Sequence, residues 1–438
     1  MSYIRNDIVL SAAKIGNVSV VEVALRGGAH VDGSPEQPCA PIVAATMASH
    51  TRMVNCLLAH GADPDRPVTM AQPFRSPDCY NTFIYPGERA LHIAANRGNV
   101  EIVRLLLKRS RADPNAINND GGTPLMANCR SPRVCVEVVE LLLEAGADPA
   151  VRDKRGITAL HSVAYSGRID LVVMLHARAP ATLNHCASEG GTPLYSACYR
   201  GHESLVSKLL SLGAMQPLPL HEGSCPLATA VSENFVGVVR VLMNEGGIRA
   251  VGGEMALANA LVMAIRFRRA TILRLLLTVD GEEGRSEWAN TYAKGNHLLH
   301  LGAGYCSSAA VGILLEAGAD ETARNSEGRI PLDGIGLGIG LDAEVRADRG
   351  REVAIRRMLQ RGPAYRARSW AWPSGEEAHA GGSGDGGIPG AAGAAAAVLS
   401  SPAAAKNPPV IGMPIFRPKE KSRSKFFARL IGRCCAKN

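Results

Sequence analysis

Apolar residues recur along this chain at helical spacing, in a unit that repeats about every 33 residues. Residues 87–116 show the unit most clearly, as two short amphipathic helices separated by Gly98-Asn99. The apolar positions of the two helices are Ala90, Leu91, Ala94 and Ala95, then Ile102, Val103, Leu106 and Leu107. Two helices of this size cannot bury their own apolar surface, so we expect the unit to be stable only when copies of it stack.

The small-residue position of the first helix, Ala94, recurs throughout the chain. Its equivalents are Ala12, Ala45, Asn128, Val163, Ala197, Ala230, Ala264, Gly302 and Ile335. Seven of the nine intervals between them are 33 to 35 residues, and the other two are 49 and 38. A glycine follows the second helix in several copies, at Gly61, Gly146, Gly213 and Gly318. We expect these glycines to end their helices in the left-handed conformation.

The turn before the first helix carries its own motif, as in Gly122-Thr123-Pro124-Leu125 and Gly191-Thr192-Pro193-Leu194. Thr at this place is predicted to cap the helix, and Pro occupies a position where its missing N–H costs nothing. With this motif and the period, the chain resembles the ankyrin-repeat family from about Asp7 to about Gly362. The resemblance implies an all-α solenoid of about ten helix-turn-helix repeats.

The resemblance also assigns a structural role to a histidine directly after the motif leucine, which is His92, His161 and His300 here. It implies that each imidazole hydrogen-bonds the backbone of neighbouring turns. The hairpin tips between copies, such as Arg152-Asp153-Lys154-Arg155, are interpreted as solvated turns of mixed charge. In this family the tips and the inner helices line the surface that binds partners.

The 49-residue interval contains an insert, interpreted as a loop at residues 66–86. It holds four of the nineteen aromatic residues of the chain, Phe74, Tyr80, Phe83 and Tyr85. Two interpretations stay open: the aromatic rings cover the solenoid, or they contact a partner. The domain plan is repeats 1–2 at 1–65, the insert at 66–86, repeats 3–10 at 87–362 with a degenerate last copy, a capping segment at 363–372, a flexible Gly/Ala/Pro-rich linker at 373–412 and a disordered tail at 413–438.

The tail carries nearly all of the net charge of the chain. Between Arg417 and Asn438 there are eight Lys or Arg residues and one Glu, which gives +7 of the total +8. The basic and apolar residues alternate as in a short amphipathic element that lies on an anionic membrane: Lys419, Lys421, Arg423, Lys425, Phe426, Phe427, Arg429, Leu430, Ile431 and Arg433. The adjacent Cys434 and Cys435 are candidate S-acylation sites, and a lipid with a basic patch is a two-signal anchor.

The sequence does not indicate catalysis, metal binding or cofactor binding. We find no phosphate-binding loop, nucleophile elbow, zinc spacing or recurring pair of carboxylates, so no catalytic or metal site, cofactor or small-molecule substrate is expected. Because the basic charge belongs to the tail, nucleic-acid binding by the repeats is not expected either. Nine scattered cysteines before residue 400 are interpreted as reduced packing residues.

The sequence therefore predicts a non-catalytic adaptor that binds one or more proteins, in the cytoplasm or on the cytosolic face of a membrane. Two alternatives remain. One is a regulatory subunit associated with an enzyme, such as a ubiquitin-ligase substrate receptor. The other is a nuclear ankyrin protein that uses its basic tail for import.

Overall fold

The computed structural model describes residues 2–69, 72–76, 79–84, 86–188, 190–215, 225–246, 253–278, 288–293, 295–335, 349–361 and 410–411. The predicted capping segment with its two tryptophans, the tail at 413–438 and most of the predicted linker lie outside these residues. The chain forms two compact units, whose boundary in the sequence falls between Ala256 and Leu257.

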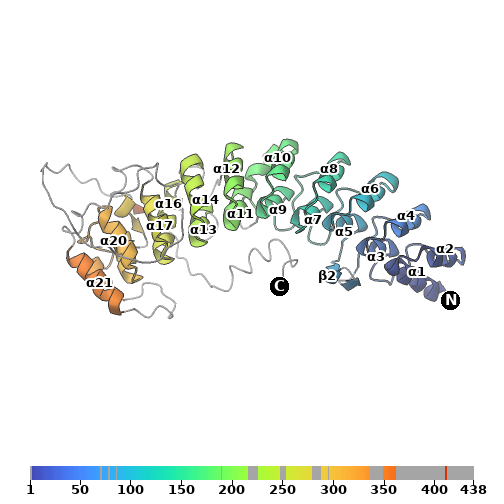
Figure 1. The fold of residues 1–438 in the computed structure, drawn as a ribbon, viewed down its shortest axis with the longest axis horizontal. Coiled ribbons are helices and arrows are strands. Elements are labelled where there is room, and N and C mark those ends of the chain that lie inside the picture. The colour runs from blue at the N-terminus through green and yellow to red at the C-terminus, as the bar shows by residue number, and fades with distance from the viewer. Residues whose placement is uncertain are drawn as a thin grey trace, which may run out of the picture. The chain divides into compact units, whose positions relative to one another are not determined.

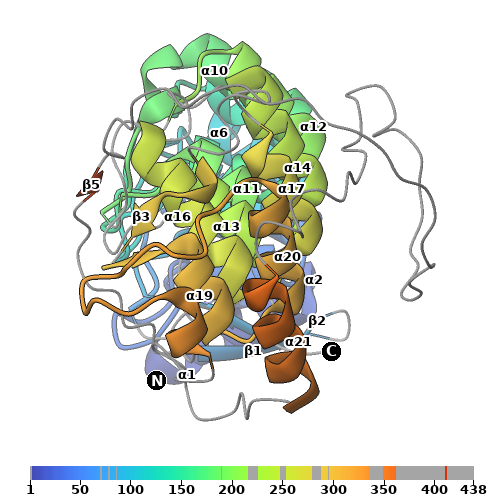
Figure 2. The ribbon, with the colours of Figure 1, turned by 90° about the vertical axis from the view of Figure 1, so that its left-hand side faces the viewer.

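The first unit is a two-layer stack of helix pairs (Figure 1). The first helices of its pairs are α1 (Ser2–Ile15), α3 (Pro41–Met47), α5 (Ala90–Asn96), α7 (Pro124–Arg130), α9 (Ala159–Ser166), α11 (Pro193–Arg200) and α13 (Pro226–Ser232). The second helices are α2 (Val18–Arg26), α4 (Thr51–Ala59), α6 (Val100–Arg109), α8 (Val136–Glu144), α10 (Ile169–Arg178), α12 (Glu203–Ser211) and α14 (Val236–Val241). Each first helix packs on the next first helix, and this row is the inner layer. Figure 2 shows the layers end-on, with α12 and α14 beside α11 and α13.

Four shorter elements also belong to the described part of this unit. A one-turn 3-10 helix, η1 (Pro180–Asn184), follows α10, and a π-helical turn, η3 (Leu242–Gly246), follows α14. Strands β1 (Gln72–Ser76) and β2 (Cys79–Ile84) form an antiparallel hairpin between α4 and α5.

The residues predicted to begin and end the helices have these roles in this unit. Thr123 Oγ1 accepts the Met126 N–H at 3.3 Å, and Thr192 Oγ1 accepts the Tyr195 N–H at 3.3 Å. The predicted stop glycines have positive φ, for example 81° at Gly61 and 91° at Gly146. The interior between the layers is filled by aliphatic side chains that are fully buried, among them Ile42, Leu57, Leu91, Ile102, Leu106, Leu125 and Leu142.

The second unit contains the remaining repeats. Its elements are α16 (Gly253–Arg266, which begins before the boundary), α17 (Ala270–Leu277), β3 (Tyr292–Ala293), β4 (Asn296–His297), α19 (Leu298–Gly304), α20 (Ser308–Glu316), the 3-10 helix η4 (Pro331–Gly334), α21 (Arg349–Gln360) and β5 (Val410–Ile411). The degenerate last copy contains α21. The glycine-rich run of the last copy lies outside the described residues from position 336 onward.

Two predicted segments differ from expectation. The insert is a β-hairpin rather than a loop, because residues that favour strands lie before Pro77-Asp78 in the sequence, at Phe74, and after it, at Tyr80, Thr82 and Phe83. Within the predicted flexible linker, Val410–Ile411 pairs in parallel with β3. This pair of β-branched residues is an exception in a segment rich in Gly, Ala and Pro.

Candidate protein-interaction surface

The motif histidines have the structural role that the family resemblance implies. His92 Nε2 lies 3.0 Å from the Gly122 carbonyl oxygen, and His161 Nε2 lies 3.1 Å from that of Gly191. His300 repeats the contact with Arg329 O at 2.8 Å. Burial lowers the pKa of His92 and of His161 to about 4, so both imidazoles are neutral at pH 7. Each of these three histidines joins its repeat to the next one.

Backbone hydrogen bonds connect neighbouring hairpin tips, so the tips lie side by side along one edge of the stack. The Asn119 N–H donates to Pro86 O at 3.4 Å, the Lys154 N–H to Asp120 O at 2.9 Å and the Ser188 N–H to Arg155 O at 2.8 Å. The root of the insert hairpin belongs to the same edge, since the Gly87 N–H donates to Val68 O and the Val68 N–H to Glu88 O, each at 2.8 Å. The tips are therefore held in register from the insert to repeat 6.

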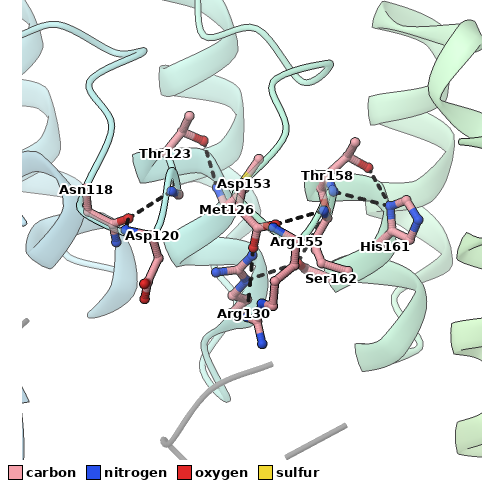
Figure 3. A network of polar contacts seen from close by, with 12 residues as sticks. Asn118, Asp120, Thr123, Met126, Arg130, Asp153, Arg155, Thr158, His161 and Ser162 are labelled. Atoms are coloured by element: carbon pink, nitrogen blue, oxygen red, sulfur yellow. Dashed lines mark hydrogen bonds and ion pairs between the residues drawn. The ribbon is translucent and has the colours of Figure 1, made fainter. Parts of the chain in front are cut away.

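In each of two tips, one side chain of the tip accepts hydrogen bonds from backbone N–H groups of the same tip (Figure 3). Asn118 Oδ1 accepts the N–H groups of Asp120 and Gly122 at 3.0 and 2.8 Å. In the next tip, Asp153 Oδ1 accepts those of Arg155 and Ile157 at 2.9 and 2.8 Å.

Asp153 also bridges two repeats. Its Oδ2 lies 2.6 Å from Nη2 of Arg130, at the end of α7, and 3.9 Å from Nη2 of Arg155 (Figure 3). The prediction that this tip is simply a solvated turn is wrong for Asp153, whose side chain is 1% exposed. The carboxylate turns inward because two backbone N–H groups and a guanidinium surround it.

Two tyrosines and an arginine continue the surface along α9 and α11. The rings of Tyr165 and Tyr199 stack with centroids 6.4 Å apart and planes inclined by 18°. The Arg200 guanidinium lies over the Tyr165 ring, 4.7 Å from its centroid. The rings pack against the buried cluster of Ile157, Ala187 and Tyr195.

These side chains lie on neighbouring first helices of the inner layer and on the tip between two of them. Arg130 contacts α9 through Ser162, with Nε 3.4 Å from Oγ, and so connects the tip to the helix that carries Tyr165. We call Arg130, Arg155, Tyr165, Tyr199 and Arg200 the Arg–Tyr patch. Arg200 is exposed, and the other four side chains are partly exposed.

Sequence reasoning missed this patch, although a signal was present. Arg130, Tyr165 and Tyr199 each lie two residues after the small-residue position of their repeat. Because successive first helices pack side by side, residues at equivalent positions become neighbours. Comparison of equivalent positions in successive repeats would have placed the three together.

The predicted site residues are only partly described. Phe74 lies in β1, while Tyr80 and Phe83 lie in β2, and the backbone register pairs Pro73 with Phe83 and Phe74 with Thr82. Tyr85, the basic and apolar residues of the tail, Cys434 and Cys435 lie outside the described residues.

Two kinds of feature are absent from the described residues. They contain no group of three or more His, Cys, Asp or Glu side chains placed to hold a metal ion. In the same residues, no helix has both the length and the apolar character needed to cross a bilayer. Of the predicted packing cysteines, five are buried: Cys39, Cys129, Cys198, Cys225 and Cys306.

Comparison with known proteins places these repeats in a family. The family described as "Ankyrin repeats (3 copies)" matches residues 74–153, 135–218 and 160–254. Cyclin-dependent kinase 4 inhibitor B of Mus musculus is 38% identical over 123 residues, which are 28% of this chain and 91% of the inhibitor. The B-cell lymphoma 3 protein homolog of Mus musculus is 26% identical over 318 residues, 65% of each chain.

A third relative is much longer than this chain. The E3 ubiquitin-protein ligase KEG of Arabidopsis thaliana is 27% identical over 261 residues, which are 56% of this chain and 16% of the ligase. The match therefore covers a small part of that enzyme, whereas it spans almost the whole kinase inhibitor. With the repeat motif, the stacked helix pairs and these matches, the chain belongs to the ankyrin-repeat family.

Proposed function

We propose that this protein is a non-catalytic scaffold that binds a partner protein on the inner layer of its repeats. The observation that carries the proposal is the Arg–Tyr patch, in which exposed Arg200 lies over Tyr165 and Tyr165 stacks on Tyr199. Tyr and Arg are among the residue types most enriched in the energetic hot spots of protein interfaces. Their fixed geometry reduces the entropy that would be lost on binding.

Binding rather than catalysis fits the chemistry of the buried polar groups. The motif histidines, which would be candidate acid–base groups elsewhere, have Nε2 directed at backbone carbonyl oxygens. Asp153 is engaged by two backbone N–H groups and by Arg130. These groups hold the repeats together, so their polar atoms are occupied by structural contacts.

Tethering to a membrane is the second part of the proposal, and it rests on the sequence of the tail. Eight Lys or Arg residues, the apolar residues Phe426, Phe427, Leu430 and Ile431, and the adjacent cysteines supply a basic patch and acylation sites together. The scaffold would then hold its partner at the cytosolic face of a membrane.

Site-specific photo-crosslinking in cells tests the partner surface. A benzophenone amino acid would replace Tyr199 in the full-length chain and, as the control, Val173, which is 41% exposed on the outer helix α10. We expect a discrete crosslinked product from position 199 that is absent from position 173. Identical products from both positions, or none from position 199, would contradict binding at the patch.

Localisation tests the tether. The full-length protein with an N-terminal fluorescent tag would be compared with a Cys434→Ser/Cys435→Ser variant. We expect the wild type at membranes and the variant to be diffuse. If both are diffuse, or both are nuclear, the anchor proposal fails while the partner surface is unaffected.

A further inference from the structure

Helix α21 of the second unit is strongly basic. Residues 349–361 contain five arginines and one glutamate, which gives this segment a net charge of +4 (5 − 1). The glutamate, Glu352, is partly exposed. In the total charge of the chain this excess is offset by acidic residues elsewhere. The segment is therefore a second concentration of positive charge, separate from the basic tail that begins at residue 413.

Most of these arginines lie on the outward side of the helix. Ile355 and Leu359 are buried, and α21 packs on α20 and η4 (Figure 2). The residues on the opposite side follow one another at intervals of four, so they form one row along the helix. This row and one arginine beside it are exposed, and we call them the α21 face: Arg349, Val353, Arg356, Arg357 and Arg361.

The carboxylates on the two elements that pack against α21 have other partners. On α20, Glu316 Oε2 lies 3.1 Å from Nη1 of Arg274 on α17. On η4, Asp333 accepts the Ile330 N–H at 3.1 Å. Within the described ranges, no ion pair joins a carboxylate to an arginine of the α21 face. The face thus presents four exposed guanidinium groups to an external anion.

This arrangement lowers helix stability unless an anion is bound. Arg357 and Arg361 are like charges four residues apart, a spacing at which side chains on a helix repel each other. Arg349 lies at the first position of α21, where the positive end of the helix dipole also disfavours a cation. Anions bound along the face would remove both costs.

The shape and composition of the face favour a lipid surface as the source of these anions. The row from Arg349 to Arg361 extends about 18 Å in one direction, so its side chains can meet a flat array of phosphate groups together. Guanidinium groups bind phosphate by paired hydrogen bonds. Val353 is 48% exposed within the row, and an apolar side chain among cations suits the boundary between headgroups and acyl chains.

The connection to the tail supports the same source. Strand β5 pairs with β3 of the second unit, the unit that also contains α21. The first basic residue of the predicted amphipathic element, Lys419, follows Ile411 by eight residues, which span at most about 29 Å. The amphipathic element therefore begins within a short reach of the unit that carries the α21 face, and both can contact one anionic surface.

We infer that the α21 face binds an anionic phospholipid membrane, with its four arginines on lipid phosphate groups and Val353 at the boundary with the acyl chains. This inference rests on the proposed membrane tether and deepens it. An anchor confined to the tail leaves the orientation of the repeats undetermined. A contact through α21 determines which side of the second unit faces the bilayer.

Sedimentation with vesicles tests the contact on the full, unacylated chain. The vesicles consist of phosphatidylcholine alone or of phosphatidylcholine mixed with phosphatidylserine. Wild type would be compared with the variant Arg349→Gln/Arg356→Gln/Arg357→Gln. We expect the variant to bind the mixed vesicles about a hundredfold more weakly, because each arginine at an anionic surface contributes about fivefold. Phosphatidylcholine vesicles should bind neither protein appreciably.

A matched control removes the same charge from exposed positions of the first unit, as Arg52→Gln/Arg133→Gln/Arg178→Gln. It should bind the mixed vesicles about as tightly as wild type, since charges farther than a Debye length of about 8 Å from the contact are screened at physiological salt. Equal weakening in the control and in the α21 variant would overturn the inference, because binding would then follow net charge alone.

A second measurement reports on the contact while all the arginines are retained. An environment-sensitive fluorescent amino acid would replace Val353 and, in a separate protein, Val173, which is similarly exposed at 41% on α10. The mixed vesicles should shift the emission to shorter wavelength at position 353 and leave position 173 unchanged. No shift at position 353, or the same shift at both positions, would overturn the inference.

A labelled DNA duplex is the competing polyanion. If the α21 variant loses duplex binding while its vesicle binding equals that of wild type, the face binds nucleic acid and the inference is overturned.

Failure of the inference is distinguishable from failure of the tether. Membrane localisation of the wild type in cells, with vesicle binding that is unaffected in the α21 variant, would retain the tether and reject the contact. A wild type that is diffuse in cells, with vesicle binding that depends on the α21 face, would reject the acylated tether and retain the lipid-binding face.

Discussion

Arg130 on α7 and Asp153 in the tip of the next repeat form an ion pair 2.6 Å long in which the carboxylate side chain is 1% exposed. The pair connects two repeats at the point where the Arg–Tyr patch begins. The same carboxylate accepts the Arg155 and Ile157 N–H groups, so the shape of the tip and the position of Arg130 depend on one side chain. We therefore expect tip stability and the binding surface to respond together to changes at Asp153.

Substitution of Asp153 by Ala should destabilise the first unit by about 3–5 kcal/mol, because it leaves Arg130 without its buried partner and frees two N–H groups. Asp153→Asn retains an Oδ1 acceptor, as Asn118 does in the preceding tip, so it should cost about 1–2 kcal/mol. Hydrogen exchange of the Arg155 and Ile157 amides would measure the effect locally. That readout is needed because repeat arrays do not always unfold in one cooperative step.

Asp148→Ala is the control for the loss of a turn-forming aspartate. Asp148 accepts the Ala150 N–H at 2.8 Å at an exposed turn. Its substitution should leave the Arg155 and Ile157 amides protected. Equal loss of protection in the Asp148 and Asp153 variants would show that the ion pair has no special role.

Glycines with the same backbone conformation should differ in their tolerance of a methyl group. At Gly167, φ is +81° and a Cβ atom would lie 2.8 Å from ring atoms of His202. At Gly146, φ is +91° and a Cβ atom would have no neighbour within 4 Å. Both changes to Ala incur the left-handed backbone cost of about 1–2 kcal/mol, and only Gly167→Ala adds overpacking of about 1–3 kcal/mol. Urea denaturation of the two variants gives the difference.

The His202 ring explains why Gly167→Ala should also affect the patch. His202 Nε2 lies 2.9 Å from the carbonyl oxygen of Tyr165, so displacement of the ring disturbs the end of α9. Gly146→Ala has no such contact to disturb. A similar loss of stability in both variants would mean that the His202 ring moves aside at little cost.

Stability should fall with acidification between pH 6.5 and about 4 because of the motif histidines. Burial lowers the pKa of His92 and of His161 from 6.5 to about 4 in the folded protein, so the unfolded chain binds more protons in this range. Stability is then complete above pH 6.5 and decreases as pH falls, by at most about 1.4 kcal/mol per pH unit for each histidine. Urea denaturation across this range would measure the slope.

Carboxylates titrate at the lower end of the same range, so the slope must be compared with that of a variant. His161→Gln retains a polar side chain and removes one titrating group. Its free energy of unfolding should depend less steeply on pH than that of the wild type. An unchanged slope would mean that the His161 imidazole does not cause the acid sensitivity.

The fold could be predicted from the repeat period because each repeat contains its own turn residues and apolar positions. Thr123, Thr192, Gly61 and Gly146 have the local roles that the motif predicts, since caps and left-handed turns depend on residues within a few positions. The prediction of a solvated turn was wrong for Asp153 because its burial depends on Arg130, which lies 23 residues earlier and on another repeat. Charge alone does not distinguish an exposed turn carboxylate from one enclosed by a neighbouring repeat.

The candidate site was harder to predict than the fold for a related reason. The contact between Tyr165 and Tyr199 joins residues 34 positions apart, and it arises only when α9 packs on α11. The insert was a candidate for partner contact because its aromatic residues are close together in the sequence. Its hairpin was missed because a few strand-favouring residues within the thirteen residues 72–84 are a weak signal inside a helical repeat protein.

The last prediction concerns Cys225, which occupies the capping position that threonine holds in other repeats. Its Sγ accepts the Ala228 N–H at 3.2 Å, and burial raises the pKa of the thiol to about 11. A hydroxyl oxygen is a better acceptor than sulfur, so Cys225→Ser should stabilise the first unit by about 0.5–1 kcal/mol. Cys198 is equally buried but lies inside α11, where Cys198→Ser places a hydroxyl in an apolar core and should cost about 1 kcal/mol or more. The same chemical change is thus expected to have opposite signs at two positions, as measured by urea denaturation. If both serine variants are destabilised alike, Sγ of Cys225 acts as a packing atom and not as a helix cap.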